Sequence, residues 1–163
     1  MNQQLNNLTN QQLNPNQFMF VLSLLQPWAS LVVMGAKTIE TRSWSTRHRG
    51  PLLIHASRGK AGEIFCSDLL FKQYIPHFHA LPFGAIVGLV TLDKILRTED
   101  FDLNDADMNL LTLEEKAFGD YTSGRYGWLL SDPVKFKYPI PARGMPGLWR
   151  CSSGIESMVS EQA

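Results

Sequence analysis

The sequence predicts a small mixed β-barrel of about six strands with two or three short flanking helices, which is an α+β fold. Short apolar runs rich in branched and aromatic residues recur between turn residues, as they do in small curled sheets. Gly84 and Gly88 lie in the strongest of these runs, 83–95, and allow the bulge or bend that a small barrel needs. The 163 residues suffice for one hydrophobic core and are too few for two.

The two ends of the chain are expected to lie outside this domain. Residues 1–17 are an Asn/Gln-rich tract with too few apolar residues to offset the entropy cost of ordering it, which predicts a disordered arm. After residue 152 the apolar pattern is lost, and we expect residues 153–163 to fray. The predicted domain is therefore 18–152.

The domain is expected to begin with a strand and a short helix. The apolar run 18–25 predicts the strand, Pro27 suits the first turn of a helix over 27–34, and Gly35 supplies its left-handed end. The further elements expected, in chain order, are strands at 37–41 and 51–56, a helix at 61–74, a strand at 83–95, a helix at 110–118 capped by Thr112 with Glu115 at its third position, and strands at 126–130, 134–138 and 148–151.

The composition is that of an ordinary globular chain, with 44% hydrophobic residues, 18% charged residues and a formal net charge of zero. No apolar run approaches the roughly 18 residues that cross a bilayer, and the first residues lack the features of a secretory signal. Cys66 and Cys151 make no metal pattern and a poor disulfide framework, which fits a reducing compartment. We therefore expect a cytoplasmic monomer with no membrane partner.

Several enzyme classes are excluded by their missing motifs. The chain has no Gly-rich phosphate loop, dinucleotide fingerprint or Ser-His-Asp arrangement, and we expect no cofactor. His77 and His79 lack a nearby third ligand, so no metal site is expected.

Charge is segregated along the chain. Residues 37–60 hold six basic residues against the single acid Glu40, and residues 93–120 hold nine acids against three basic residues. Residues 121–150 are basic again, with five basic residues against Asp132. This pattern indicates one surface built for an anionic partner and another that water solvates.

The first candidate site consists of basic, acidic and aromatic residues from the first helix to the loop after the next strand: Trp28, Lys37, Glu40, Arg42, Trp44, Arg47 and Arg49. Basic side chains neutralise phosphates and exposed indoles stack on unpaired bases, a combination that holds single-stranded nucleic acid. In a strand, Glu40 and Arg42 share a face and are expected to pair, with Lys37 on the other face. The alternative is that the tryptophans belong to the core and the charges are solvated turn residues.

A second segment, 121–128, is expected to supply the facing wall of a pocket. Its glycines allow the backbone to approach a ligand, and Ser123, Arg125 and Tyr126 offer hydrogen-bond donors and a stacking ring. A structural turn explains the same pattern equally well. The Gly/Pro-rich segment 142–149 is expected to form a lid or a pocket wall.

The stretch QPWASLVVMGAKTIETRSWSTRHRGPLLIHAS, with the later GRYGWLL and IPARGMPGLWR, resembles the ASCH (activating signal cointegrator homology) domain family. The resemblance covers about 18–152 and rests on Lys-Thr-Ile-Glu-x-Arg after a Gly-terminated helix, followed by Arg-Gly before an apolar strand. It implies the β-barrel that this family shares with PUA RNA-binding domains, and a cleft between barrel and first helix suited to RNA, DNA or a nucleoside. The residues that match the family motif are Gln26, Pro27 and Trp28 at the helix start, Lys37, Glu40 and Arg42 on the strand, and Trp44 and Arg49 in the loop.

The resemblance also suggests a reaction. Some small bacterial members of the family are amidohydrolases that remove the acyl group of N4-acetylcytidine with a lysine, a threonine three residues later and a downstream glutamate. Lys37 matches the lysine, but Glu40 stands at the threonine position, so the hydroxyl nucleophile is missing there. The downstream acid falls within 105–115, where the sequence does not select one residue.

The sequence favours a nucleic-acid-binding protein that uses a basic-aromatic cleft, with RNA, another single-stranded nucleic acid or a nucleoside as its partner. The binding residues expected are Gln26, Trp28, Arg42, Trp44, Arg47, Arg49, Arg125 and Tyr126. One alternative is a small enzyme acting on RNA or a modified nucleoside, either a ribonuclease or an N4-acetylcytidine-type amidohydrolase. Its candidate catalytic residues are Lys37, Glu40, Tyr121, Ser123 and Arg125. Another alternative is a protein-interaction module whose aromatic loop contacts a second chain.

Overall fold

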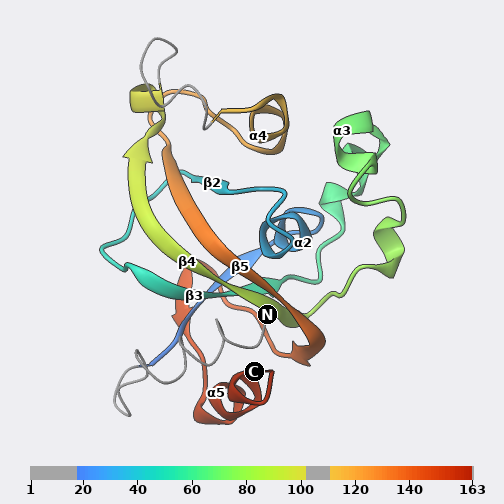
Figure 1. The fold of residues 1–163 in the computed structure, drawn as a ribbon, viewed down its shortest axis with the longest axis vertical. Helices are drawn as coiled ribbons and strands as arrows, with labels where there is room; N and C mark the ends of the chain where they lie inside the picture. Colours follow the sequence, from blue (N-terminus) through green and yellow to red (C-terminus); the bar gives the residue numbers. More distant parts are fainter. Residues whose placement is uncertain (1–17, 102–110, 163) are drawn as a thin grey trace.

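One six-stranded sheet forms the body of the protein and curls into a half-barrel (Figure 1). The computed structural model describes residues 18–101 and 111–162. The strands are β1 (Phe20–Leu24), β2 (Ile39–Arg42), β3 (Gly50–Ala56), β4 (Ala85–Arg97), β5 (Tyr126–Pro141) and β6 (Leu148–Arg150). Across the sheet their order is β2-β5-β4-β3-β1-β6, with β1 parallel to β3 and the other neighbouring pairs antiparallel. The predicted α+β fold of about six strands is confirmed.

Short helical segments connect these strands. Among the described residues they are α2 (Trp28–Val33), α3 (Leu69–Lys72), α4 (Leu113–Phe118) and α5 (Ser153–Ser160), with 3₁₀ turns η1 (Ala61–Ser67), η2 (Phe78–Ala80) and η3 (Thr98–Phe101). Helix α2 follows the cis peptide bond Gln26–Pro27 and ends before Gly35, whose φ is +77°, as the sequence predicted. None of the helices in the described part of the chain is long and apolar enough to span a membrane.

Two apolar clusters divide the core according to strand alternation. Leu22 of β1 packs in the cluster that contains α2, whereas its neighbour Val21 packs with Val159 of α5. Helix α2 lies so close to β4 that a Cβ at Gly88 would fall 2.8 Å from Cβ of Val33. The glycine predicted to bend β4 therefore also makes room for the helix.

A third apolar cluster joins three helices. Leu31 of α2, Phe71 of α3 and Phe118 of α4 are all buried in it. This cluster fixes α4 and α2 beside β2, while α5 lies at the opposite end of the molecule (Figure 1). The candidate site forms around β2, within this frame.

The strands expected at 126–130 and 134–138 are one long strand, β5. Asp132, with φ of +49°, and Pro133 form an irregularity in the pairing with β4 instead of a turn between two strands. The predicted turn was wrong because bulges and turns draw on the same residue types, and residues on both sides of this bulge still pair with β4.

The helix expected at 61–74 is divided into η1 and α3. Asp68 lies between them in extended conformation, and its Oδ1 accepts the main-chain N–H of Leu70 at 2.8 Å. The aspartate thus starts a new helix at its own position, which the apolar pattern alone did not reveal.

Residues 153–160 form helix α5 instead of the expected frayed end. Ser152 Oγ caps the helix by accepting the N–H of Ile155 at 3.4 Å, and Val159 is buried. Fraying was wrong for this stretch because Ile155 and Val159, one turn apart, both pack on the sheet core. The arm expected at 1–17 lies outside the described residues.

Candidate functional site

A buried ion cluster lies on β2 and on the residues just before it. Lys37 is 1% exposed, and its Nζ lies 3.6 Å from Oε2 of Glu40 and donates to the main-chain oxygen of Ile39. Nη1 of Arg42 lies 3.6 Å from Oε1 of the same carboxylate. Two cations therefore share one buried acid, an arrangement that makes buried charge tolerable.

The pairing of Glu40 with Arg42 is as predicted, but Lys37 is not on a separate face. Strand β2 begins at Ile39, so the two-residue alternation does not extend back to Lys37. Its long side chain instead bends into the same cluster.

A second buried acid, Glu115 of α4, contacts the residue after Lys37. Its Oε1 accepts the main-chain N–H and the hydroxyl of Thr38, the latter at 2.8 Å. Thr112 caps α4 by accepting the N–H of Glu115 at 3.2 Å, as predicted, but the Glu115 side chain crosses to Thr38. The sequence left the acid within 105–115 open; the first six residues of that range lie outside the described part of the chain.

Tyr121 lies close enough to both acids to be affected by their charge. Burial, and after it the negative charges of Glu115 and Glu40, raise the pKa of Tyr121 far above its usual range, so its phenol keeps a proton to donate. Within the described residues, neither Tyr121 Oη nor Glu115 Oε2 has a hydrogen-bond partner. Two buried polar atoms without partners mark a place where a ligand or water would be bound.

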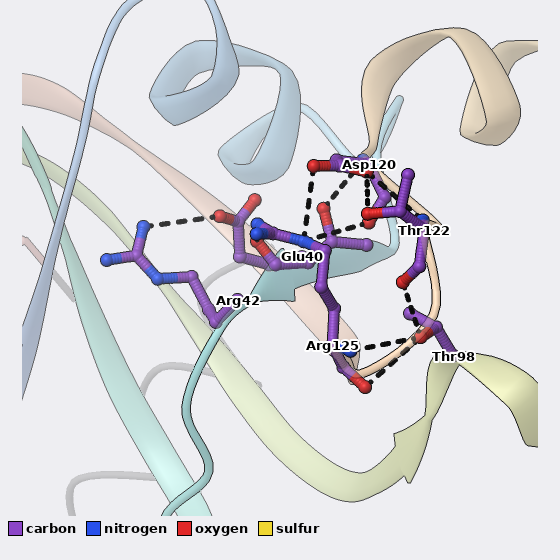
Figure 2. A network of polar contacts seen from close by, with 7 residues as sticks. Glu40, Arg42, Thr98, Asp120, Thr122 and Arg125 are labelled. Atoms are coloured by element: carbon purple, nitrogen blue, oxygen red, sulfur yellow. Dashed lines mark hydrogen bonds and ion pairs between the residues drawn. The ribbon is translucent and has the colours of Figure 1, made fainter.

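Arg125 ties the turn after α4 to β2 (Figure 2). Its Nε lies 3.1 Å from the main-chain oxygen and 3.4 Å from Oδ2 of Asp120, and its Nη2 donates to the Thr41 oxygen at 3.3 Å. Thr98 holds the Arg125 backbone through bonds of 3.2 and 3.0 Å. Hydrogen bonds from Thr122, and then the Arg125 charge, lower the pKa of Asp120. The guanidinium is thus fixed by contacts inside the protein.

Ser123 is directed to a different partner. Its hydroxyl donates to Oε1 of Glu99 at 2.7 Å on the exposed surface. This bond, with further bonds from the Glu99 and Gly124 backbone, lowers the pKa of Glu99 to about 2. The fold therefore does not bring Ser123 to Lys37, its expected catalytic companion.

A hollow of about 240 Å³ opens beside the ion cluster, between α2, η1, β2 and the segment after α4. Its lining residues are Trp28, Phe65, Glu40, Thr41 and 117–120. The ring of Trp28 stands edge-on to Phe65 with centroids 5.1 Å apart, and its Nε1 donates to the Phe118 oxygen at 2.8 Å. A further hollow of about 510 Å³ shares Gly119 with it and includes Tyr121.

Gln26 was expected to touch nucleic acid, but it is fully buried. Its Oε1 accepts the Ser30 N–H at 3.0 Å, and its Nε2 donates to the Pro82 oxygen at 2.8 Å. Its amide therefore holds the first turn of α2 against the chain before β4.

The other aromatic candidates are partly covered. Trp44 packs edge-on against Trp128 with centroids 4.9 Å apart, and the Arg42 guanidinium lies 5.4 Å from the Trp44 centroid. Tyr126 pairs with Arg42 across β2 and β5 and has the Arg97 guanidinium 5.5 Å from its ring centroid. The rings of Trp44 and Tyr126 thus each make a cation–π contact with one arginine of the protein.

The cations of the β2–β3 loop are exposed. Arg49 Nη1 donates to the main-chain oxygens of Thr46 at 3.0 Å and of His48 at 2.6 Å, while Arg47 projects from the same loop. Neither arginine lines the 240 Å³ hollow. The 240 Å³ hollow is therefore lined by the acid Glu40 and not by these arginines, and the basic β2–β3 loop forms a separate surface.

A sequence model of the ASCH domain matches residues 22–139. The chain belongs to the ASCH domain family. Activating signal cointegrator 1 from human and from mouse are each 29% identical to it over 140 residues, which are 82% of this chain and 22% of the cointegrator. The chain thus spans about a fifth of the length of these relatives, and the family is generally linked to RNA binding.

Solved ASCH structures have the same fold. The ASCH protein of Zymomonas mobilis gives a TM-score of 0.55 at 19% identity, covering 87% of this chain and 94% of that chain. A variant of it gives a TM-score of 0.56 at 18% identity, covering 90% of this chain and 97% of that chain. The family resemblance drawn from the sequence is therefore confirmed, together with the fold.

Two members of the site in this ASCH domain, Glu115 and Tyr121, are only loosely indicated by sequence. The Thr112 cap placed Glu115 in the first turn of a helix, and Gly119 stands two residues before Tyr121. A Cβ at Gly119 would lie 2.7 Å from the Tyr121 ring, so the glycine lets the ring close against the chain. The Thr112 cap and Gly119 indicate the local structure, but they do not show which distant residues Glu115 and Tyr121 contact.

Proposed function

We propose that this ASCH domain binds single-stranded nucleic acid, RNA in preference, and that one base enters the 240 Å³ hollow. The observation that carries the proposal is the Glu40 carboxylate in a hollow walled by Trp28 and Phe65. Unpaired bases stack on aromatic rings, and a carboxylate accepts hydrogen bonds from the amino group of a base.

Glu40 suits this role because it is fixed in place. Cations at 3.6 Å hold each of its oxygens, and an ionised carboxylate still offers further acceptor positions. Cytosine, adenine and guanine carry an exocyclic amino group that uracil lacks. The hollow is therefore expected to prefer these three bases to uracil.

Phosphates are expected on the exposed loop. Arg47 and Arg49 are its cations, and Trp44 and Tyr126 are the neighbouring rings along which further bases would lie. Arg125 acts here by positioning Thr41 at the hollow, and Gln26 takes no ligand contact.

Fluorescence anisotropy with labelled ten-nucleotide RNA tests the base preference. Oligocytidine is expected to bind about fivefold more tightly than oligouridine, as one hydrogen bond of about 1 kcal/mol provides. Trp28→Ala should weaken the binding of both oligonucleotides. Equal affinity for oligocytidine and oligouridine would mean that Glu40 does not contact a base.

The same titration at several salt concentrations tests the phosphate contacts. Replacing Arg47 and Arg49 by glutamine should reduce the slope of log K against log salt by about 1.4, since each single-strand phosphate contact contributes about 0.7. The matched control replaces Lys135 and Lys137, exposed cations of β5, and should leave the slope unchanged. Binding that does not depend on salt would contradict the proposal.

A second candidate function is hydrolysis of RNA or of an acylated nucleoside. It is favoured by Oε2 of Glu115 and Oη of Tyr121, which lie beside the Lys37 cluster and have no hydrogen-bond partner in the described part of the chain. Glu115 would take a proton from the attacking water, and the Tyr121 phenol would donate to the developing negative charge.

Product chromatography after incubation with N4-acetylcytidine or RNA tests this candidate. Glu115→Gln is expected to abolish turnover by about a hundredfold or more, whereas Ser123→Ala, on the exposed surface, should retain it. Absence of turnover with wild-type protein would leave binding as the function.

A further inference from the structure

A larger hollow lies away from β2, where the parallel strands β1 and β3 end. Its volume is about 670 Å³, and Ser23 of β1 and His55 of β3 form its floor as direct neighbours in the strand register. The segment 142–146 between β5 and β6 and Gly84 before β4 complete it. It shares no lining residue with the hollows beside β2.

A continuous series of hydrogen bonds runs along the floor of this hollow. Trp149 Nε1 donates to Ser23 Oγ at 3.0 Å, Ser23 Oγ lies 3.2 Å from His55 Nδ1, and His55 Nε2 lies 3.0 Å from the Ala142 oxygen. A carbonyl oxygen only accepts, so Nε2 carries a hydrogen. Burial lowers the pKa of His55, which favours the neutral ring, and in the neutral ring Nδ1 accepts the Ser23 hydroxyl.

The residues that line this hollow carry positive charge. Arg58 and Arg143 line it, and its lining contains no carboxylate. Among the described residues, neither arginine has an ion-pair partner, whereas Arg42 and Arg125 each lie within 3.6 Å of an acid. Guanidinium groups without an acidic partner are suited to binding phosphate, to which they donate paired N–H hydrogen bonds.

Two glycines allow the chain to pack closely beside these arginines. A Cβ at Gly84, whose φ is +64°, would lie 2.8 Å from Arg58 Nε, so the arginine rests against bare backbone. A Cβ at Gly144 would lie 2.4 Å from His55 Cε1, so the loop that carries Arg143 lies directly on the floor network. The network thereby supports the loop that carries Arg143, and Gly84 leaves room for the Arg58 side chain.

We propose that this hollow is a second binding site, for a phosphate monoester held between Arg58 and Arg143. A volume of about 670 Å³ falls within the range of small-molecule sites and exceeds what inorganic phosphate alone would fill. The ligand is therefore a phosphate attached to a larger group. Its source is either a free mononucleotide or the phosphorylated end of a nucleic-acid chain.

Calorimetric titration of the whole chain with adenosine 5′-monophosphate tests the site, with adenosine as the ligand without phosphate. The nucleotide is expected to bind more tightly than adenosine, whose base can occupy only the hollow beside β2. The double variant Arg58→Gln, Arg143→Gln should lose at least about tenfold in affinity, because charged hydrogen bonds of about 1.5 kcal/mol or more are removed. Lys135→Gln, an exposed cation on β5, is the matched control and should bind as wild type.

Short RNA with and without a 5′-phosphate separates the two sources. Phosphate-dependent binding of the mononucleotide identifies a metabolite site, and phosphate-dependent binding of RNA alone identifies a chain-end site; both support the proposal if the double variant loses them. Equal binding of adenosine and its monophosphate, or a double variant that binds as wild type, overturns it. Loss of base preference at the β2 hollow would leave this result unaffected, since the two hollows share no residue.

Discussion

The region around β2 and the hollow at the ends of β1 and β3 use arginine in opposite ways. Beside β2, Arg42 lies 3.6 Å from Glu40 and Arg125 lies 3.4 Å from Asp120. In the larger hollow, Arg58 and Arg143 line a surface without an acid. An arginine beside an acid is fixed by that pairing and positions its neighbours, whereas an arginine without an acid keeps its full charge for a ligand.

This difference indicates what each region would recognise. At β2 the hollow is lined by aromatic rings and a fixed carboxylate, which distinguish bases by their hydrogen-bond donors. At the larger hollow two exposed arginines lie beside the Ser23–His55 floor, which favours negative charge with little regard to the group that carries it.

Removing Lys37 from the Lys37–Glu40–Arg42 cluster should destabilise the protein more than any other change proposed for these two regions. Lys37→Met leaves Glu40 buried with Arg42 as its remaining cation and is expected to lower the free energy of unfolding by about 3 kcal/mol. Arg58→Met, at an exposed arginine with no ion-pair partner among residues 18–101 and 111–162, should change it by less than about 0.5 kcal/mol. Urea denaturation followed by tryptophan fluorescence measures both. Similar values for the two variants would show that pairing does not distinguish the regions.

Introducing an acid should convert the larger hollow into a paired one. Met145 lines it and is 48% exposed, so Met145→Glu should fold normally and weaken adenosine 5′-monophosphate binding at least about tenfold through charge repulsion and pairing with the arginines. Met145→Gln has the same length without the charge and should weaken binding less than about threefold. Calorimetry measures both affinities. Equal losses would mean that shape, and not charge, controls the site.

The predictable parts of the fold are those that one residue type determines locally. Gly35 ends α2 with a positive φ, and Thr112 caps α4, as their sequence neighbours indicated. Period-two alternation correctly paired Glu40 with Arg42, since both lie within β2. The same rule failed for Lys37, which precedes the strand.

The unpredicted parts depend on contacts between distant segments. Glu115 meets Thr38 across 77 residues, and His55 meets Ala142 across 87, which no local pattern encodes. The segment 142–149 was expected to form a pocket wall, and residues 142–146 do line a hollow, but one built on His55 and away from the basic loop. Nothing in the sequence indicated that the segment 142–146 would lie against His55.

The smallest expected effect concerns the neutral floor of the larger hollow. His55 faces Ser23, the Ala142 oxygen, the Trp149 ring and the charge of Arg58. Burial first, and the Arg58 charge as a lesser cause, lower its pKa below the ordinary value near 6.5, so the unfolded chain takes up a proton before the folded one does. The stability that neutral His55 contributes is therefore complete above pH 6.5 and is lost as pH falls from there through the folded pKa.

Urea denaturation between pH 7.5 and about 5 should show this loss in wild type, at a slope of at most about 1.4 kcal/mol per pH unit for one proton. His55→Gln should flatten the slope, whereas His77→Gln, at an exposed histidine, should not. Histidine NMR signals give the same answer directly, with the His55 midpoint below 6.5. An unchanged slope in His55→Gln would mean that folding does not shift the pKa of His55, so that the folded protein would protonate His55 as pH falls through about 6.5. Three cations would then share the hollow, and its phosphate affinity would rise as pH falls instead of depending on two arginines alone.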